Sequence, residues 1–359
     1  MSENKQSLYV FAGSYASRDE QGLKVFKLDE ESGALSLQHE YAGLQNPTFL
    51  NVDAQNKLLY AISEAVDENG VKSGEAAAFR IDASTGALTP LNVAPTVRST
   101  TCHIQRDAKN RYLTVTSYHG GMTGLLSIND DGGIGTLLDV KQHEGRGPHP
   151  NQDRPHPHSS FYSPDGSYLY VQDLGLDIIA VYRLDAENGK LELQSKTSLE
   201  PEAGPRHLVF HPKAPFVYVI NELNSTVTVL RQNAKSGQLE ALQSYSTLPE
   251  SFKGENGCAE IAISGDGHFL YGSNRGHDSI VVYKVNQETG ELETVQHVST
   301  GGGHPRHFAF TPDGKWLLAA NRDGNNIVTF RVNAASGKLE PAGHEILASK
   351  PVCVIPVYL

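Results

Sequence analysis

The sequence is poor in cysteine and has no long apolar run, and each shortage excludes a class of protein. Its three cysteines, Cys102, Cys258 and Cys353, lie far apart and form no Cys-x-x-Cys pair. This excludes a disulfide framework and a cysteine-rich zinc site, and it is typical of a reducing compartment. No stretch approaches the roughly 20 apolar residues of a membrane helix. The N-terminal segment MSENKQSLYVFAGSY lacks the pattern of a secretory signal, so we expect a cytoplasmic protein without a membrane partner.

Several motifs of familiar enzyme classes are also missing. The chain has no Gly-x-Ser-x-Gly nucleophile elbow, no phosphate-binding P-loop and no His-Glu-x-x-His metal-binding pair. The glycine-rich segment GGMTG (120–124) lies between two expected strands, which argues against a nucleotide site. A net charge of −11 argues against non-specific binding to nucleic acid. We therefore expect no cofactor, no metal and no nucleic-acid partner.

Glycine is abundant, and its positions reveal an internal repeat. A glycine takes the positive φ of a tight hairpin turn without steric cost. The runs before and after these turns are rich in Val, Ile, Tyr and Phe, and no helical stripe separates them, so parallel β–α–β structure is not expected. The glycine turns recur roughly every 50 residues, at ESGAL (31–35), STGAL (84–88), DDGGIG (130–135), ENGKL (187–191), KSGQL (235–239), ETGEL (288–292) and ASGKL (335–339).

Seven such units, each with about four short strands, predict an all-β fold, the seven-bladed β-propeller. The chain starts on a second-strand sequence, LYVFAGSY (8–15), and ends on a first-strand sequence, KPVCVIPVYL (350–359). We therefore expect the C-terminal strand to join the N-terminal blade and close the ring, which removes two exposed sheet edges. An open two-sheet sandwich gives no reason for these complementary ends. Residues 1–359 are expected to form a single propeller domain.

Polar residues before the first strands and after the second strands should meet at one mouth of the central channel. They differ from unit to unit, which favours a small pocket that accepts an anion over a uniform scaffold. The alternative is that the arginines and carboxylates only pair across neighbouring blades. The residues are His103, His158, Arg206, His207, Glu260, Arg306 and His307 on the first-strand side, and Glu64, Tyr118, Asp173, Glu222, Arg275 and Arg322 on the second-strand side.

The segment GRGPHPNQDRPHPHSSF (145–161) contains three histidines, His149, His156 and His158, each beside a proline. Three histidines can ligate a metal, but in a proline-rich loop their rings need not converge, and no defined strand or helix spacing adds a further ligand. We interpret the segment as the loop that leads into the fourth unit, with His158 at the threshold of its first strand.

Several segments closely resemble the seven-bladed lactonase family, and the resemblance spans essentially the whole chain. They are PHPHSSFYSPDGSYLYVQDLGLDIIAVYRL (155–184), GPRHLVFHP (204–212), VYVINELNSTVTV (217–229), LPESF (248–252) and YGSNRGHDSIVVYKV (271–285). The bacterial members of this family are the propeller-type 6-phosphogluconolactonases, and a fungal relative is the carboxy-cis,cis-muconate cyclase. The segment 141–155 is richer in Pro, Gly and His than in compact members.

The resemblance implies a hydrolase of the pentose phosphate pathway that opens a sugar-phosphate lactone. Carried over by motif, its catalytic set falls on His158, Arg206, Glu222 and Arg275. A second copy of the GPRH pattern, HPRH (304–307), adds two substrate-binding candidates. The predicted substrate-binding residues are His103, Tyr118, His156, His207, Arg306, His307 and Arg322.

With no serine or cysteine nucleophile in view, we expect water to attack the lactone carbonyl directly. His158 or Glu222 would act as general base, while Arg206 and Arg275 would hold the phosphate and stabilise the oxyanion. Two alternatives remain open. One is a muconate-type cyclase or another lactonase on the same fold, and the other is a non-catalytic propeller that binds a protein partner. The sequence predicts no oligomeric state.

Overall fold

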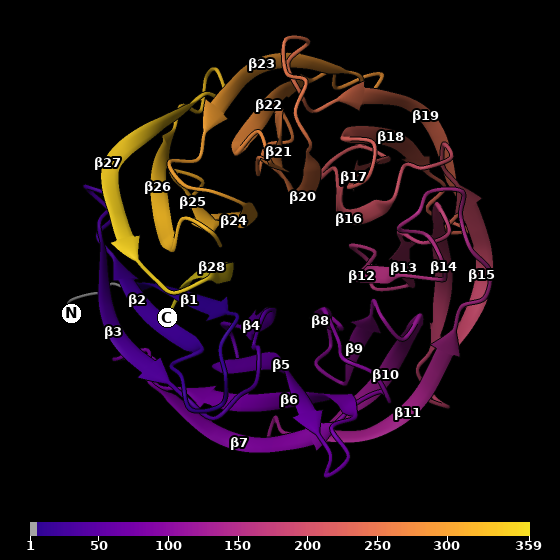
Figure 1. Cartoon of the computed structure of the whole chain (residues 1–359), viewed down its shortest axis with the longest axis vertical. Coiled ribbons are helices and arrows are strands. Elements are labelled where there is room, and N and C mark those ends of the chain that lie inside the picture. Colours follow the sequence, from indigo (N-terminus) through magenta and orange to yellow (C-terminus); the bar gives the residue numbers. More distant parts are fainter. Residues whose placement is uncertain (1–5) are drawn as a thin grey trace.

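The computed structural model describes residues 6–359, which form a ring of β-sheets around a central axis (Figure 1). Seven four-stranded antiparallel sheets make up the ring, so the predicted seven-bladed β-propeller is confirmed. We number the blades 1 to 7 in the order in which their outer strands follow along the chain. Nothing in residues 6–359 forms a helix with the length and apolarity that crossing a bilayer requires.

Each blade runs from an innermost strand at the axis to an outermost strand at the circumference (Figure 1). In that order, blade 1 contains β28 (Pro351–Tyr358), β1 (Leu8–Ser14), β2 (Leu23–Leu28) and β3 (Leu35–Tyr41); blade 2 contains β4 (Leu50–Asp53), β5 (Leu58–Val66), β6 (Lys72–Ile81) and β7 (Leu88–Pro95); blade 3 contains β8 (His103–Arg106), β9 (Tyr112–Ser117), β10 (Met122–Ile128) and β11 (Ile134–Gln142); and blade 4 contains β12 (Pro157–Tyr162), β13 (Tyr168–Asp173), β14 (Ile178–Asp185) and β15 (Lys190–Ser198). Blade 5 contains β16 (Pro205–Phe210), β17 (Phe216–Asn221), β18 (Thr226–Gln232) and β19 (Leu239–Ser246); blade 6 contains β20 (Gly257–Ile263), β21 (Phe269–Arg275), β22 (Ser279–Val285) and β23 (Leu292–Ser299); and blade 7 contains β24 (Pro305–Phe310), β25 (Trp316–Asn321), β26 (Asn326–Val332) and β27 (Leu339–Leu347).

The hydrophobic core lies between neighbouring blades. Between blades 5 and 6, for example, Tyr218 and Val229 of one sheet pack with Leu270 and Tyr283 of the next. Both faces of a blade are covered in this way, so its second strand is buried along most of its length, and at every position in β17 and β25. This is why these strands read as continuous apolar runs and do not alternate. The outermost strands, such as β19, are mostly exposed.

The ring closes where the two halves of blade 1 meet. β28 pairs with β1 in antiparallel register from Leu8 opposite Tyr358 to Ser14 opposite Pro351. Figure 1 shows the yellow C-terminal strand beside the indigo N-terminal one. The predicted closure is confirmed: β1 is paired on both edges, and β28 takes the innermost place that the first strand occupies in every other blade.

The glycine turns lock each blade to its neighbour. Tyr271 of β21 donates its hydroxyl to the carbonyl of Gly337 in the next blade at 2.7 Å. Gly337 has a φ of +70°, and a Cβ there would lie 2.3 Å from the ring of Phe269. Tyr170 makes the same bond to Gly237. The repeated glycine is therefore required both by the turn and by close packing against the adjacent blade.

Candidate active site

Four innermost strands begin with a proline whose following residue bulges out of the sheet register; in β28 that residue is Val352, and in the other three it is a histidine or an arginine. β12, β16 and β24 start at Pro157, Pro205 and Pro305. Proline is tolerated at the first position of a strand. Directly after it, the pairing with the second strand shifts by one residue in all three blades. Such β-bulges re-aim a side chain and are common beside active sites. The bulged residues are His158, Arg206 and Arg306.

A cavity of about 280 Å³ lies at this end of the channel. Ligand pockets start at about 300 Å³, so the cavity suits a small molecule. Four of the predicted catalytic and substrate-binding residues line it, namely Tyr118, His158, Glu222 and Arg306, as does Glu64, which the sequence also placed at the mouth. The rest of its lining consists of Tyr15, Thr48, Thr100, Thr101, Cys102 and His119.

Glu222, in the loop after β17, bridges two arginines. Its Oε2 lies 3.1 Å from Nε of Arg206 and 2.8 Å from Nη2 of Arg275. Arg275 also donates from Nε and Nη2 to backbone carbonyls of β20, at 3.0 and 2.6 Å. Burial favours the neutral form of Glu222, but the charges of Arg275, Arg206 and Arg306 outweigh it and lower the pKa of the carboxyl. Glu222 is therefore ionised at neutral pH and orients two guanidinium groups.

Arg206 is held against the neighbouring blade. Its side chain is 2% exposed, and Nη1 donates to the carbonyl of Ala259 in β20 at 2.7 Å. Burial, together with the like charges of Arg306 and Arg275, lowers the pKa of Arg206 to about 9, which leaves it charged at neutral pH. Nη2 of Arg206 and Nη1 of Arg275 have no hydrogen-bond partner among residues 6–359. Both arginines therefore keep a free donor, but neither is among the residues that line the cavity. Arg206 lines an adjoining hollow of about 10 Å³ that shares His158 and Arg306 with the cavity.

Two histidines in the cavity wall, His119 and His158, have ring nitrogens without a hydrogen-bond partner among residues 6–359, and of the two only His158 is buried, since His119 is exposed. Nδ1 of His158 is itself buried. The ring lies edge to face with Tyr118 at 5.8 Å and with His207 at 5.3 Å between centroids. Burial and the charge of Arg206 hold the pKa of His158 well below 6.5. The imidazole is therefore neutral at pH 7 and free to accept a proton.

Arg306 differs from the other two arginines because no carboxylate neutralises it. Its guanidinium lies 5.9 Å from the ring centroid of Tyr15. It makes no ion pair or hydrogen bond with any of residues 6–359, yet it lines the cavity. Glu64 also lines the cavity, but it is paired with Lys72 at 3.1 Å. The cavity therefore carries an unpaired positive charge at Arg306, inside a protein whose net charge is −11.

Three predicted substrate contacts, His103, His207 and His307, lie below the cavity and do not line it. They pack around Phe49, with ring centroids 4.4, 5.9 and 5.7 Å away. Burial lowers the pKa of all three, and that of His307 falls to about 4. His207 and His307 each follow a bulged arginine, whereas His103 begins β8, which pairs with β9 without a register shift. These histidines support the pocket floor, which differs from the predicted contact with substrate.

His156 and Arg322 also lie outside the cavity lining. His156 stacks on the far face of Tyr118 at 4.2 Å, and its Nδ1 is 2.8 Å from the Tyr118 carbonyl oxygen. His156 therefore supports the Tyr118 ring, which forms part of the cavity wall. Nε of Arg322 lies 2.7 Å from a carboxylate oxygen of Asp323, so its charge is paired outside the cavity.

The three histidines of the segment 145–161 have different partners. Nδ1 of His149 accepts the backbone N–H of Asn151 at 3.0 Å, His156 supports Tyr118, and His158 faces the cavity. Among residues 6–359, no group of three His, Cys, Asp or Glu side chains has the arrangement of a metal site. The segment 141–155 is anchored to blade 4 by His143, whose Nδ1 lies 2.6 Å from Asp173 and whose Nε2 lies 2.8 Å from the Tyr182 hydroxyl.

Tyr15, Thr48 and Cys102 line the cavity but were absent from the predicted site residues. Thr48 and Cys102 precede innermost strands, in the segments NPTF and TTCHI, and Tyr15 follows a second strand. Thr48 and Cys102 occupy the repeat position of His158, and Tyr15 occupies that of Glu222. This equivalence between repeat units is the sequence signal that could have identified them as lining residues. Burial raises the pKa of the Cys102 thiol to about 11, which keeps it protonated and disfavours a nucleophilic role.

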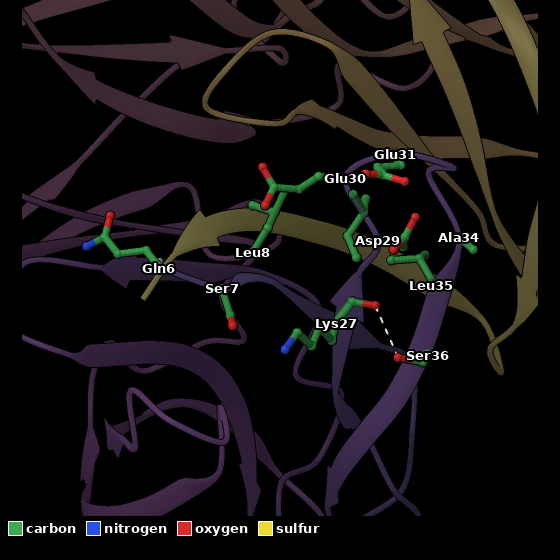
Figure 2. A pocket seen from close by; sticks show the side chains of 11 residues that line it. Gln6, Ser7, Leu8, Lys27, Asp29, Glu30, Glu31, Ala34, Leu35 and Ser36 are labelled. Atoms are coloured by element: carbon green, nitrogen blue, oxygen red, sulfur yellow. Dashed lines mark hydrogen bonds between the residues drawn. The ribbon is translucent and has the colours of Figure 1, made fainter. Parts of the chain in front are cut away.

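A second hollow, of about 430 Å³, lies where β1 starts beside the β2–β3 hairpin (Figure 2). Its lining combines Lys27 with Asp29, Glu30 and Glu31. These groups serve the closure of the ring, because Tyr358 donates its hydroxyl to Glu30 at 3.0 Å. The hollow has no histidine or arginine in its wall, so the channel cavity is the stronger candidate.

Known proteins share this ring over its full length. The 6-phosphogluconolactonase of Bacillus subtilis (strain 168) is 37% identical over 300 residues, which cover 84% of each chain. The crystal structure of a Lactobacillus plantarum protein has a TM-score of 0.89 at 32% identity and covers 98% of this chain and 99% of that one. The structure of the periplasmic gluconolactonase of Pseudomonas aeruginosa has a TM-score of 0.90 at 29% identity, with coverage of 98% and 99%. The family model "Lactonase, 7-bladed beta-propeller" matches residues 9–356. Because this match spans every blade and includes the bulged segments around the cavity, the chain belongs to the seven-bladed β-propeller lactonase family.

Proposed function

We propose that this protein is a 6-phosphogluconolactonase, which hydrolyses 6-phosphoglucono-1,5-lactone to 6-phosphogluconate. One observation carries the choice of a phosphorylated substrate: Arg306 is an unpaired cation beside a neutral histidine with free ring nitrogens. The 37% identity to the Bacillus subtilis enzyme supports the same activity. The cavity volume of about 280 Å³ suits a ligand the size of a single sugar.

In this proposal the phosphate binds Arg306, because Arg206 and Arg275 already share the carboxylate of Glu222. A guanidinium keeps its charge and presents a rigid fork of donors to an anion. This assignment revises the expectation that Arg206 and Arg275 hold the phosphate. Their free N–H groups would instead face the carbonyl oxygen as it becomes an oxyanion.

His158 acts as the general base. A water oxygen forms a bond to the lactone carbonyl carbon, and its proton passes to a ring nitrogen of His158. Collapse of the tetrahedral intermediate breaks the bond between this carbon and the ring oxygen, which takes the proton back from the imidazolium. The product is a hydroxy acid, whose carboxyl then ionises. Glu222 is a poorer base, since two guanidinium groups stabilise its charged form.

The phosphate site is tested by Arg306→Gln with a pair of lactones, 6-phosphoglucono-1,5-lactone and unphosphorylated glucono-1,5-lactone. A hydrogen bond to a charged group is worth about 1.5–3 kcal/mol, so we expect KM for the phosphorylated lactone to rise roughly 10- to 150-fold. The KM for the unphosphorylated lactone should change less than threefold. Initial rates are measured by acid release, with the spontaneous hydrolysis subtracted.

Arg183→Gln is the matched control, because Arg183 is exposed on β14, far from the cavity lining. It should leave both KM values unchanged. Equal losses on the two lactones in Arg306→Gln would contradict a phosphate at this position. A wild-type preference for the unphosphorylated lactone, or for carboxymuconolactone, would assign the pocket to another lactone and refute the proposed substrate.

A further inference from the structure

Below Arg206, a chain of side chains leads to a second buried carboxylate. Nη1 of Arg206 lies 3.4 Å from Nε2 of His207. Arginine nitrogens only donate, so this histidine nitrogen is the acceptor and carries no proton. The proton of the neutral imidazole is therefore on Nδ1, which lies 3.0 and 3.1 Å from the two oxygens of Glu260. Glu260 thus determines which nitrogen His207 presents to Arg206.

Glu260 is placed in the channel by a bulge that has no proline. The register of β20 with β21 shifts between Cys258 and Ile261, so two residues face one. The N–H of Glu260 consequently donates to the hydroxyl of Ser273 at 2.9 Å, and the N–H of Ile261 donates to Oε1 at 3.0 Å. The residue is 7% exposed. The same bulge supplies the Ala259 carbonyl that binds Arg206. The two bulged residues therefore both hold this arginine, Ala259 directly and Glu260 through His207.

A second histidine fixes the other side of the carboxylate. Nε2 of His307 lies 3.2 Å from Oε2 of Glu260, while its Nδ1 accepts the N–H of Val354 at 3.3 Å. His307 is therefore also protonated on the nitrogen that faces Glu260. Two imidazole N–H groups point at one carboxylate, and each is held in that tautomer by a partner on its other side.

The charges of the site explain why a second carboxylate is needed. Arg206, Arg275 and Arg306 contribute three positive charges, and Glu222 alone balances one of them. Burial raises the pKa of the Glu260 carboxyl, while His307 and Arg206 favour its charged form. In that form Glu260 supplies the second negative charge. Its charge favours the protonated form of Arg206, whose pKa burial lowers. The net charge that remains is then a single positive one, at the unpaired Arg306.

We infer that Glu260 is a positioning residue for lactone hydrolysis: through the hydrogen bond to His207 it holds Arg206 in place, so that the free N–H of Arg206 faces the reacting carbonyl. This inference rests on the proposed function. A carboxylate that orients an imidazole, which in turn orients the group that meets the ligand, is a recurring arrangement in proteins. Glu260 touches no cavity surface and acts only through other residues.

Glu260→Gln tests this arrangement. A glutamine replaces one acceptor oxygen by an NH2 donor, which in either orientation faces the Nδ1–H of His207 and a second N–H, that of Ile261 or that of His307. Reversing the His207 tautomer to relieve this would set Nε2–H against an arginine N–H. We expect kcat to fall roughly 10- to 100-fold, the range of losses from orienting partners. KM for the phosphorylated lactone should stay constant or fall, because the site loses a negative charge. A rise in KM that matches the fall in kcat would indicate general disruption and overturn the inference.

A double-mutant cycle with His207→Gln shows whether Glu260 acts through His207. The double variant should lose no more of kcat than the more damaging single variant, and multiplied losses would overturn the inference. Asp53→Asn is the matched control, since Asp53 is a buried carboxylate 3.8 Å from Arg106 at the other end of an innermost strand. It should lower thermal stability and leave kcat within twofold. A similar loss of kcat in this control would assign the effect to stability.

A spectroscopic readout separates this inference from the proposed function. In ¹⁵N-histidine-labelled protein, the ¹H–¹⁵N spectrum should show His207 protonated on Nδ1 in the wild type and on a different nitrogen, or exchanging, in Glu260→Gln. An unchanged tautomer would overturn the inference whatever the protein hydrolyses. If the wild type hydrolysed neither lactone but the tautomer changed, the proposed function would fail while the support of Arg206 by Glu260 remained.

Discussion

Replacing His158 by glutamine is expected to lower kcat for 6-phosphoglucono-1,5-lactone by roughly 10²- to 10⁴-fold, the contribution of a well-placed general base. Glutamine fills similar space but cannot take a proton from water. The KM for the lactone should change little, since Arg306 and not His158 binds the phosphate. His149→Gln is the control from the same loop, because His149 contacts its own turn and not the cavity. Retention of more than half of wild-type kcat in His158→Gln would contradict the assignment.

The pH profile gives a second readout of His158. The base is active when neutral, and its pKa lies well below 6.5 because of burial and the nearby arginine charges. Activity of the free enzyme should therefore persist as the pH falls to 6.5 and decline only below it. A bound phosphate offsets the charge of Arg306, so the pKa of His158 should be higher in the complex than in the free enzyme. The profile of kcat reports the complex, and its acid limb should disappear in His158→Gln.

Replacing Glu222 by glutamine is expected to damage both stability and activity. The variant leaves Arg206, which is 2% exposed, and Arg275, which is 9% exposed, without a counter-charge. Breaking a fully buried ion pair costs about 3–5 kcal/mol. Glu222 is 23% exposed and thus partly screened, so we expect a loss of about 2 kcal/mol in the free energy of unfolding. We also expect kcat to fall at least tenfold, because both guanidinium groups lose the carboxylate that orients them. Urea unfolding at pH 7 and initial rates measure the two effects.

Glu75→Gln provides the comparison for this variant. Glu75 also pairs with an arginine, Arg18, at 2.6 Å, but that arginine is 47% exposed. A surface pair of this kind contributes at most about 1 kcal/mol, and we expect a change below about 0.5 kcal/mol and unaltered kinetics. Similar unfolding free energies for the two variants would show that the pair at Glu222 is no more important than a surface ion pair.

The sequence predicts the architecture well because the propeller repeats its physical requirements. Every glycine turn needs a positive φ and a surface that can approach the neighbouring blade, as Gly337 does against Phe269. Strands such as FVYVIN are apolar on both faces because blades cover both sides. The half-blades at the ends of the chain could pair only with each other. These features are local in sequence, and so the fold and its closure were predictable.

The roles within the site were less predictable because they depend on single-residue shifts and on pairing across blades. The motifs GPRH and HPRH look equivalent, yet Arg206 is neutralised by Glu222 and Arg306 is not. The bulge that places Glu260 follows a glycine and a cysteine and has no proline to reveal it. The sequence also does not show how deep in the channel a side chain lies. For this reason His207 and His307 were predicted to contact substrate, although neither lines the cavity.

The central claim is that the channel cavity catalyses the opening of a phosphorylated sugar lactone. The most direct test is the initial rate of 6-phosphoglucono-1,5-lactone hydrolysis with purified wild-type protein, followed by acid release at a pH where the spontaneous reaction is slow. We predict a rate that is proportional to enzyme concentration, saturates with substrate and exceeds the spontaneous rate many-fold at micromolar enzyme. Progress curves that superimpose with and without the protein would contradict the claim.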